Sequence, residues 1–113
     1  MRYVLSPQAD ADLVSIYEYT ITTWGVDQFH IYRQQIESAI QAIVANPLLP
    51  RSKERNDLLT GIRLFRVEHH YIAYRVRTDV VEMGEFYTKA CILKHRFRMM
   101  IFNFNDTTNI LLF

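Results

Sequence analysis

Three stretches rich in β-branched and aromatic residues follow one another closely in the second half of the chain, and this spacing constrains the fold more than any other feature. They cover residues 62–67, 71–77 and 80–83, and Thr78-Asp79 forms the turn between the last two. Their composition is typical of β-strands. Parallel neighbours would need connections of a dozen or more residues, so we predict an antiparallel meander.

The first half of the chain carries the start and stop signals of two helices. Ser6 can cap a first helix, Pro7 suits its first position, and Gly25 suits its end. We predict that Asp27 caps a second helix, which ends at residues 46–47 because the residue before a proline disfavours helical dihedrals. The predicted apolar stripes are Ala9, Leu13, Ile16, Tyr17, Thr20 and Trp24 in the first helix and Phe29, Tyr32, Ile36, Ala39, Ile40 and Ile43 in the second.

These elements define an α+β class of fold. Residues 1–5 are predicted to form a first strand, and the two helices, joined by a short link, form an antiparallel hairpin. Residues 47–60 mix prolines with charges and are predicted to be a loop with at most one short turn. We therefore expect a helical hairpin packed on one face of a small, mainly antiparallel sheet in the order β-α-α-β-β-β.

Length and composition predict one globular domain over residues 1–113, since half of the residues are hydrophobic. No apolar run approaches the roughly 20 residues that cross a bilayer, and no signal-peptide pattern follows Met1. Cys91 is the single cysteine, so no intramolecular disulfide is possible. We expect a cytoplasmic protein without a cofactor.

The charges are unevenly distributed although the formal net charge is only +1. Residues 1–60 carry five Lys/Arg against seven Asp/Glu, and residues 61–100 carry eight against four. This asymmetry favours an anionic partner for the second half, either nucleic acid or an acidic protein segment. The alternative is an ordinary solvated strand face.

The adjacent histidines His69 and His70 are the side chains most suited to acid/base chemistry or metal binding. Neighbours on a strand point to opposite faces, and Cys91 and His95 lie far away in the sequence. We therefore expect strand-end or turn histidines and no metal site.

The arginines of the predicted strands suggest a second chemistry, the binding of phosphates or carboxylates. Arg63 and Arg75 could stabilise a pentacoordinate phosphate during RNA cleavage. Plain surface arginines are the alternative. The acid/base candidates for such cleavage are Glu68, His69, His70 and Tyr74. The aromatic residues assigned to helix packing, not to base stacking, are Tyr17, Tyr19, Trp24, Phe29 and Tyr32.

The first 84 residues resemble the ParE branch of the RelE/ParE superfamily of bacterial type II toxins. Four segments carry the resemblance in the order that the family shows. They are LSPQADADL at 5–13, YTITTWG at 19–25, YRQQIESAI at 32–40 and GIRLFRVEHHYIAYRV at 61–76.

The resemblance implies a toxin that a small ParD-like antitoxin holds silent by wrapping the helical hairpin and the sheet edge. It implies inhibition of DNA gyrase rather than hydrolysis. The alternatives are a RelE-like, ribosome-dependent mRNA endoribonuclease and an inactive remnant that only binds antitoxin. The RelE residue set does not match position by position, so no catalytic residue is assigned. The candidate contacts to target or antitoxin, from charge and position, are Arg63, Arg66, His69, His70 and Arg75.

The chain departs from the family pattern after Gly84. ParE-like chains continue with a segment resembling Arg-Ile-Leu-His-x-x-Met-Asp, whereas residues 85–91 read EFYTKAC. One encoding of this peptide, GAATTTTACACAAAAGCATGT, yields Ile-Leu-His-Lys-Ser-Met when it is read two bases later. We hypothesise that residues 85–113 are either an insertion or a tail shifted by the loss of one base. The gene sequence tests this hypothesis.

Overall fold

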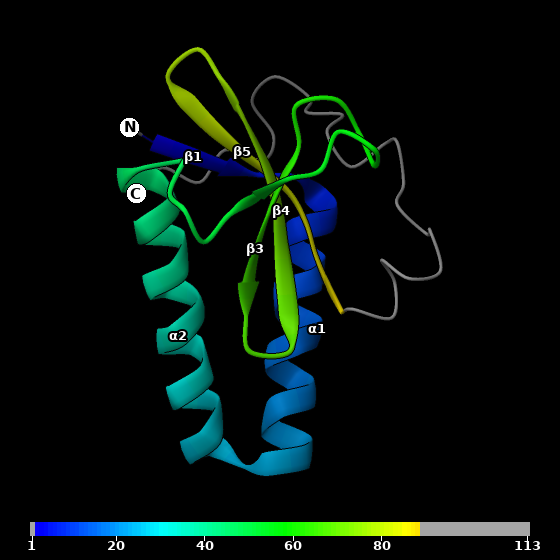
Figure 1. Cartoon of the computed structure of the whole chain (residues 1–113). Coiled ribbons are helices and arrows are strands. Elements are labelled where there is room, and N and C mark those ends of the chain that lie inside the picture. The colour runs from blue at the N-terminus through cyan, green and yellow to red at the C-terminus, as the bar shows by residue number, and fades with distance from the viewer. Residues whose placement is uncertain (1, 89–113) are drawn as a thin grey trace.

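The computed structural model describes residues 2–88 and consists of a helical hairpin on one face of a twisted five-stranded sheet (Figure 1). The elements are β1 (Arg2–Leu5), α1 (Pro7–Trp24), α2 (Val26–Ala45), β2 (Lys53–Glu54), β3 (Arg63–Val67), β4 (His70–Arg77) and β5 (Val80–Thr88). The predicted α+β class and the hairpin-on-sheet arrangement are confirmed.

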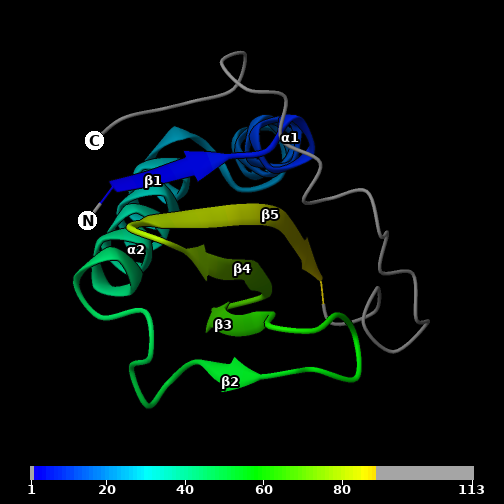
Figure 2. The ribbon, with the colours of Figure 1, turned by 90° about the horizontal axis from the view of Figure 1, so that it is seen from above.

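The strand order across the sheet is β1-β5-β4-β3-β2, as the view from above shows (Figure 2). The strands β2 to β5 pair antiparallel, and β1 lies parallel to β5 with Leu5 opposite Met83. The last strand therefore returns beside the first one, and the helical hairpin together with β2, β3 and β4 lies in the chain between these two parallel partners.

The core lies between the hairpin and the sheet. Helix α2 contributes Ile36 and Ile43, which are almost fully buried, and the sheet contributes Ile72, Val81 and Met83. These strand residues alternate along their strands, so each points to the same face of the sheet. Within residues 2–88, neither helix is long and apolar enough to serve as a membrane span.

The link between the helices is tighter than the sequence analysis predicts. Gly25 alone separates α1 from α2, and its φ of 96° and ψ of 169° lie in a region that glycine tolerates and other residues rarely adopt. Asp27 lies in the first turn of α2 and is not the cap, so that prediction is wrong. The carboxylate still lies near the helix N-terminus, where the helix dipole favours it.

Two strand predictions also need correction. The loop at 47–60 contains β2, a short edge strand that pairs with the start of β3. Strand β5 continues past Gly84 to Thr88, and Phe86 is buried in the core. A β-bulge accommodates Gly84, since Ala73 pairs with Glu85 and Tyr74 pairs with Met83.

The hypothesis of an insertion or a shifted reading frame is untested by the fold. Of the residues that it concerns, 85–88 belong to β5 and 89–113 lie outside the described residues. Cys91 and His95 are among the latter.

Candidate functional site

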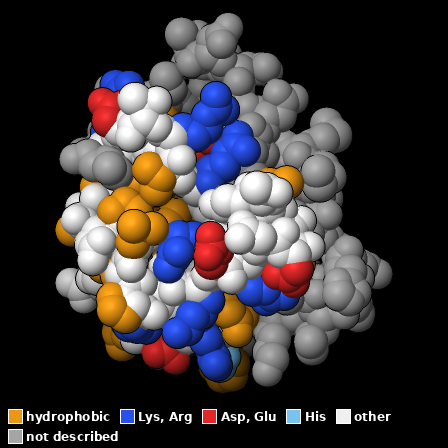
Figure 3. Space-filling model, turned by 45° about the horizontal axis from the view of Figure 1, so that its top comes forward, with side chains coloured by type: hydrophobic (Ala, Val, Ile, Leu, Met, Phe, Trp, Pro, Cys, Tyr) orange, Lys and Arg blue, Asp and Glu red, His pale blue; other side chains and the backbone are white. Residues whose placement is uncertain are grey.

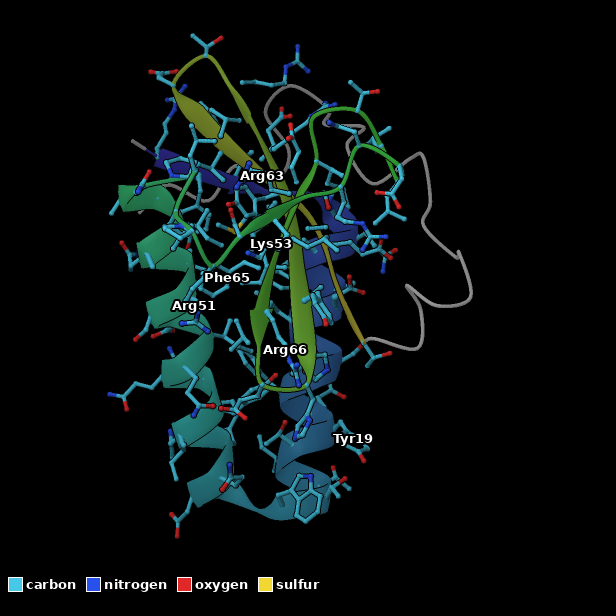
Figure 4. All side chains as sticks on the ribbon, viewed as in Figure 1. Tyr19, Arg51, Lys53, Arg63, Phe65 and Arg66 are labelled. Atoms are coloured by element: carbon cyan, nitrogen blue, oxygen red, sulfur yellow. The ribbon has the colours of Figure 1, made fainter. Side chains whose placement is uncertain are left out.

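Four basic side chains surround the outer edge of the sheet where β2 pairs with β3. We call this set, Arg51, Lys53, Arg63 and Arg66, the basic edge. The pairing of Lys53 with Leu64 brings the end of the 47–52 loop beside β3. Figure 4 shows the four side chains along this edge together with Phe65. In the space-filling view, Lys and Arg side chains cover more of this side than acidic ones, and an apolar patch lies beside them (Figure 3).

The guanidinium groups of the basic edge are oriented by neutral partners. Arg63 donates from Nε to Ser52 Oγ at 2.7 Å and from Nη2 to the Ser52 carbonyl at 3.1 Å. Arg51 lies over the Phe65 ring at 4.8 Å, a cation–π geometry. Arg66 donates from Nε to the Glu68 carbonyl at 2.9 Å. These contacts hold the groups without neutralising them, so the edge can attract an anionic partner.

A groove of about 490 Å³ runs between α2 and β3 beside the basic edge. Its lining includes Ile31, which is 50% exposed, and the buried apolar side chains of Ala39, Phe65 and Val67, with Arg51 and Arg66 at the side of the sheet. Hydrogen-bonded and non-hydrogen-bonded residue pairs alternate along an antiparallel ladder. The backbone N–H and C=O of Val67 therefore face β4, and those of Arg66 face the outer edge of the sheet. The Arg66 carbonyl accepts a hydrogen bond from Arg51 Nη2 at 3.4 Å. The groove therefore offers apolar surface, positive charge and a strand edge together.

A second hollow of about 840 Å³, which we call the aromatic cleft, lies between the hairpin, the β3–β4 turn and the end of β5. Tyr19 and Trp24 line it and are 63% and 68% exposed. The prediction that these two residues pack in the core is therefore wrong. Tyr32 is buried as predicted. Tyr17 packs edge-on against Phe29, and the centroids of the two rings are 5.3 Å apart.

A hydrogen-bonded pair forms one wall of the aromatic cleft. Tyr32 donates from its hydroxyl to the Val67 carbonyl at 3.0 Å, and the same oxygen lies 2.6 Å from His70 Nδ1. The Tyr32 hydroxyl has a single proton, which it donates to the Val67 carbonyl, so its oxygen accepts the hydrogen bond from His70. We therefore infer that the His70 ring carries its proton on Nδ1. Burial raises the pKa of Tyr32 to about 12. Burial and the neighbouring His69 lower the pKa of His70, so both groups are neutral at pH 7.

The five candidate contact residues do not form one cluster. Arg63 and Arg66 belong to the basic edge, whereas His69 and His70 lie at the β3–β4 turn and line the aromatic cleft. Arg75 lies on the sheet face opposite to the hairpin, where its Nε contacts Glu82 Oε1 at 2.7 Å. The arginines Arg63 and Arg66 thus lie on one surface, the two histidines lie on another, and Arg75 forms an ion pair elsewhere.

The residues proposed for RNA cleavage are not brought together either. By register Arg63 shares a face with Tyr74, and Arg75 points to the other face. Tyr74 is fully buried and donates its hydroxyl to the Pro47 carbonyl at 2.5 Å. Glu68 and His69 lie in the turn beyond the end of β3. Among residues 2–88, no three His, Cys, Asp or Glu side chains gather in a way that could hold a metal ion.

The sequence analysis missed Arg51, Lys53 and Phe65. Only the pairing of β2 with β3 places residues 51–53 beside residues 63–66. The signal in the sequence is the alternation of basic residues in RSKER at 51–55. Because this stretch is predicted to be a loop, the alternation is not interpreted as one side of a strand.

Comparison of the fold with solved structures gives a match to the chromosomal ParDE TA system from P. aeruginosa, with a TM-score of 0.63 and 22% identity over 78% of this chain and 95% of that one. The architecture is therefore of the RelE/ParE type, as predicted. The family model of the ParE toxin of the type II toxin-antitoxin system, parDE, matches residues 3–84. The chain belongs to the ParE toxin family.

Curated relatives agree with this assignment. The toxin ParE1 of Mycobacterium tuberculosis is 37% identical over 75 residues, which are 66% of this chain and 74% of that protein. The toxin ParE of Escherichia coli is 34% identical over 62% of this chain and 66% of that protein. The toxin ParE1 of Caulobacter vibrioides is 31% identical over 72% and 84%, respectively.

Proposed function

We propose that this ParE family toxin acts in the cytoplasm, inhibits DNA gyrase and is neutralised by a ParD-like antitoxin. The observation that carries the proposal is the family match over residues 3–84, which includes the hairpin, the basic edge and residues 80–84 of β5. The P. aeruginosa structure of similar fold is described as a ParDE system, which supports an antitoxin as partner.

Inhibition by binding fits the described surfaces better than catalysis does. The groove and the aromatic cleft are open to solvent, and the basic edge lies beside the groove. General acid/base catalysis needs its groups within hydrogen-bond reach of one reacting centre. Tyr74 is buried and the proposed arginines point to opposite faces, which speaks against the alternative of a ribosome-dependent endoribonuclease.

The test is induced expression of the full chain in a gyrase-dependent bacterium without antitoxin, combined with a supercoiling assay on purified gyrase. We expect growth arrest, a DNA damage response and loss of supercoiling together with trapped, cleaved DNA. Arrest with mRNA cleavage and unimpaired gyrase would instead establish the endoribonuclease. Unimpeded growth by a folded protein would identify a remnant that only binds antitoxin.

The antitoxin half of the proposal has a separate test. Co-expression of a small open reading frame adjacent to the toxin gene should restore growth, and its product should co-purify with the toxin. A product that co-purifies without restoring growth would contradict neutralisation.

A further inference from the structure

The sheet face that is turned away from the helical hairpin, which we call the far face, carries buried side chains. The strand register places Val4 of β1, Leu64 of β3, Ala73 of β4, and Glu82 and Glu85 of β5 on this face. Ala73 is 0% exposed, and the other four are between 4% and 8% exposed. A sheet face in contact with water leaves such side chains accessible, so a layer of atoms covers the far face.

The β-bulge at Gly84 brings both glutamates to the far face. In a regular strand, residues 82 and 85 point to opposite faces because side chains alternate. The extra residue of the bulge places Glu82 opposite Arg75 and Glu85 opposite Ala73, on one face. Arg75 donates from Nε to Glu82 Oε1 at 2.7 Å. The far face therefore combines apolar side chains with two buried carboxylates, a combination that favours a cover with both apolar and basic side chains.

The described elements do not supply this cover. Both described helices pack on the other face of the sheet (Figure 2). The loop at 55–62 joins β2 to β3 and is folded into tight turns, since the Arg55 N–H donates to the Ile62 carbonyl and the Leu58 N–H to the Arg55 carbonyl, both at 3.0 Å. Neighbouring strands lie about 4.8 Å apart, so β5 and β1 are roughly 14 Å and 19 Å from β2. The loop therefore does not reach Val4 or Glu82.

Residues 89–113 have the composition that the far face favours. They include the apolar runs MMIF at 99–102 and ILLF at 110–113, which would promote aggregation if they contacted water. Their basic residues are Lys89, Lys94, Arg96 and Arg98, against the single acid Asp106. They follow Thr88 at the end of β5, the strand that carries both glutamates, so only a short loop has to close.

We propose that residues 89–113 pack on the far face of the same chain, with apolar side chains over Val4 and Ala73 and a basic side chain beside Glu85. The family match ends at residue 84, so this layer is a feature of this chain beyond the family model. The proposal does not depend on the inhibition of gyrase, because it concerns packing alone.

The experiment measures how fast a maleimide reagent labels single cysteines in the full chain. Cys91→Ser removes the native thiol, and Ala73→Cys or Arg77→Cys then introduces one thiol on the far face. Position 73 is fully buried and position 77 is exposed on the same strand. Each rate is divided by the rate of the same variant in urea. We expect Ala73→Cys to react at least about a hundredfold more slowly than Arg77→Cys.

Substitutions in the proposed layer identify the source of the protection. Arg96→Glu combined with Arg98→Glu should raise the labelling rate of Ala73→Cys at least about tenfold. The matched control reverses two exposed charges on the hairpin side, Arg33→Glu and Arg51→Glu, and should change the rate by less than about twofold. Circular dichroism checks that every variant is folded. Limited trypsin digestion of the unsubstituted chain needs no variant, and cleavage after Lys94, Arg96 and Arg98 should begin only at urea concentrations that unfold the domain.

Three results would overturn the proposal. One is labelling of Ala73→Cys as fast as that of Arg77→Cys, or rapid tryptic cleavage at residues 94–98 of the folded chain. Another is slow labelling that the double substitution at Arg96 and Arg98 leaves unchanged, which would assign the cover to other residues. The third is protection that disappears on dilution together with a dimer in size-exclusion chromatography, which would assign the cover to a second copy of the chain.

Discussion

Ser6 connects the first helix to the bulge in the last strand through both its side chain and its backbone. Its Oγ accepts the Ala9 N–H at 3.0 Å as the cap of α1 and donates to the Gly84 carbonyl at 2.6 Å. Its own N–H donates to the Met83 carbonyl at 3.0 Å. A helix cap that the sequence shows therefore also fixes the position of β5 against α1.

Replacing Ser6 by alanine removes the cap and leaves the buried Gly84 carbonyl without this donor. We expect the free energy of unfolding to fall by about 1–3 kcal/mol. Urea denaturation measures it, with Ser38→Ala on the exposed side of α2 as control, which should change it by less than about 0.5 kcal/mol. Equal effects of the two substitutions would contradict the double role.

His70 makes stability depend on pH because its ring is partly buried in the folded state. Its pKa in the folded state is lowered, first by burial and then by His69, so the unfolded chain takes up a proton at higher pH than the folded chain does. The contribution of His70 to the free energy of unfolding is therefore fully present above the ordinary pKa of 6.5 and is lost as the pH drops below it.

We expect wild-type protein to lose stability between pH 7 and pH 5 with a slope for this group of at most about 1.4 kcal/mol per pH unit. His70→Gln should remove part of that slope. The measurement is urea denaturation at a series of pH values, with His30→Gln at an exposed position of α2 as the matched control. A slope that is identical in wild type and His70→Gln would refute the assignment.

At the scale of elements, the extension of β5 is the main difference from the sequence-based expectation. Past the bulge, Phe86 points into the core, and its N–H donates to Asp12 Oδ2 at 3.0 Å. Strand and helix thus support each other beyond the point where the family pattern ends.

If β5 packs in this way, Phe86→Ala should cost about 3–5 kcal/mol of the free energy of unfolding. Thr88→Ala, at an exposed position of the same strand, should cost far less. Thermal and urea denaturation of the full chain distinguish the two. Similar values for both variants would place the end of the ordered strand near Gly84.

The hairpin depends on the backbone of Gly25. A side chain at its φ of 96° is strained even though no atom lies near enough to clash with an added Cβ. Gly25→Ala should therefore destabilise the protein by on the order of 1–3 kcal/mol, measured by urea denaturation. Thr23→Ala, exposed in the last turn of α1, is the control. An unchanged stability of Gly25→Ala would mean that the link adopts another conformation.

At the scale of the whole molecule, charge is separated between the hairpin and the sheet edge. Residues 7–45 contain Arg33 as their single Lys/Arg, against Asp10, Asp12, Glu18, Asp27 and Glu37. The basic edge lies on the other side of the groove from α2. This separation orients an acidic partner toward β2 and β3.

Electrostatic attraction of this kind weakens with salt. Between about 0.1 M and 1 M salt the Debye length shrinks from ~10 Å to ~3 Å, so the affinity for an acidic peptide bound at the basic edge should fall. Lys53→Gln should reduce the salt dependence, and Arg77→Gln should not. Anisotropy titrations at several salt concentrations measure both, and an affinity independent of salt would argue against the basic edge.

The sequence by itself determined the elements, because their signals are local. Ser6-Pro7, Gly25 and Asn46-Pro47 act on their own backbone or on adjacent turns, and apolar periodicity reports which side of a helix or strand is buried. These signals were enough for the two helices, the meander and the α+β class. They also placed Arg63 and Arg66 on a strand.

Only the tertiary structure decided which surfaces exist. The pairing of Lys53 with Leu64 brings together two segments that are separated in the sequence. Contacts of this kind leave no local pattern in either segment. Trp24 lies on the apolar stripe of α1, yet it remains exposed because α1 extends beyond the sheet that covers its earlier turns (Figure 1). Periodicity gives the direction of a side chain, whereas burial depends on what lies opposite to it.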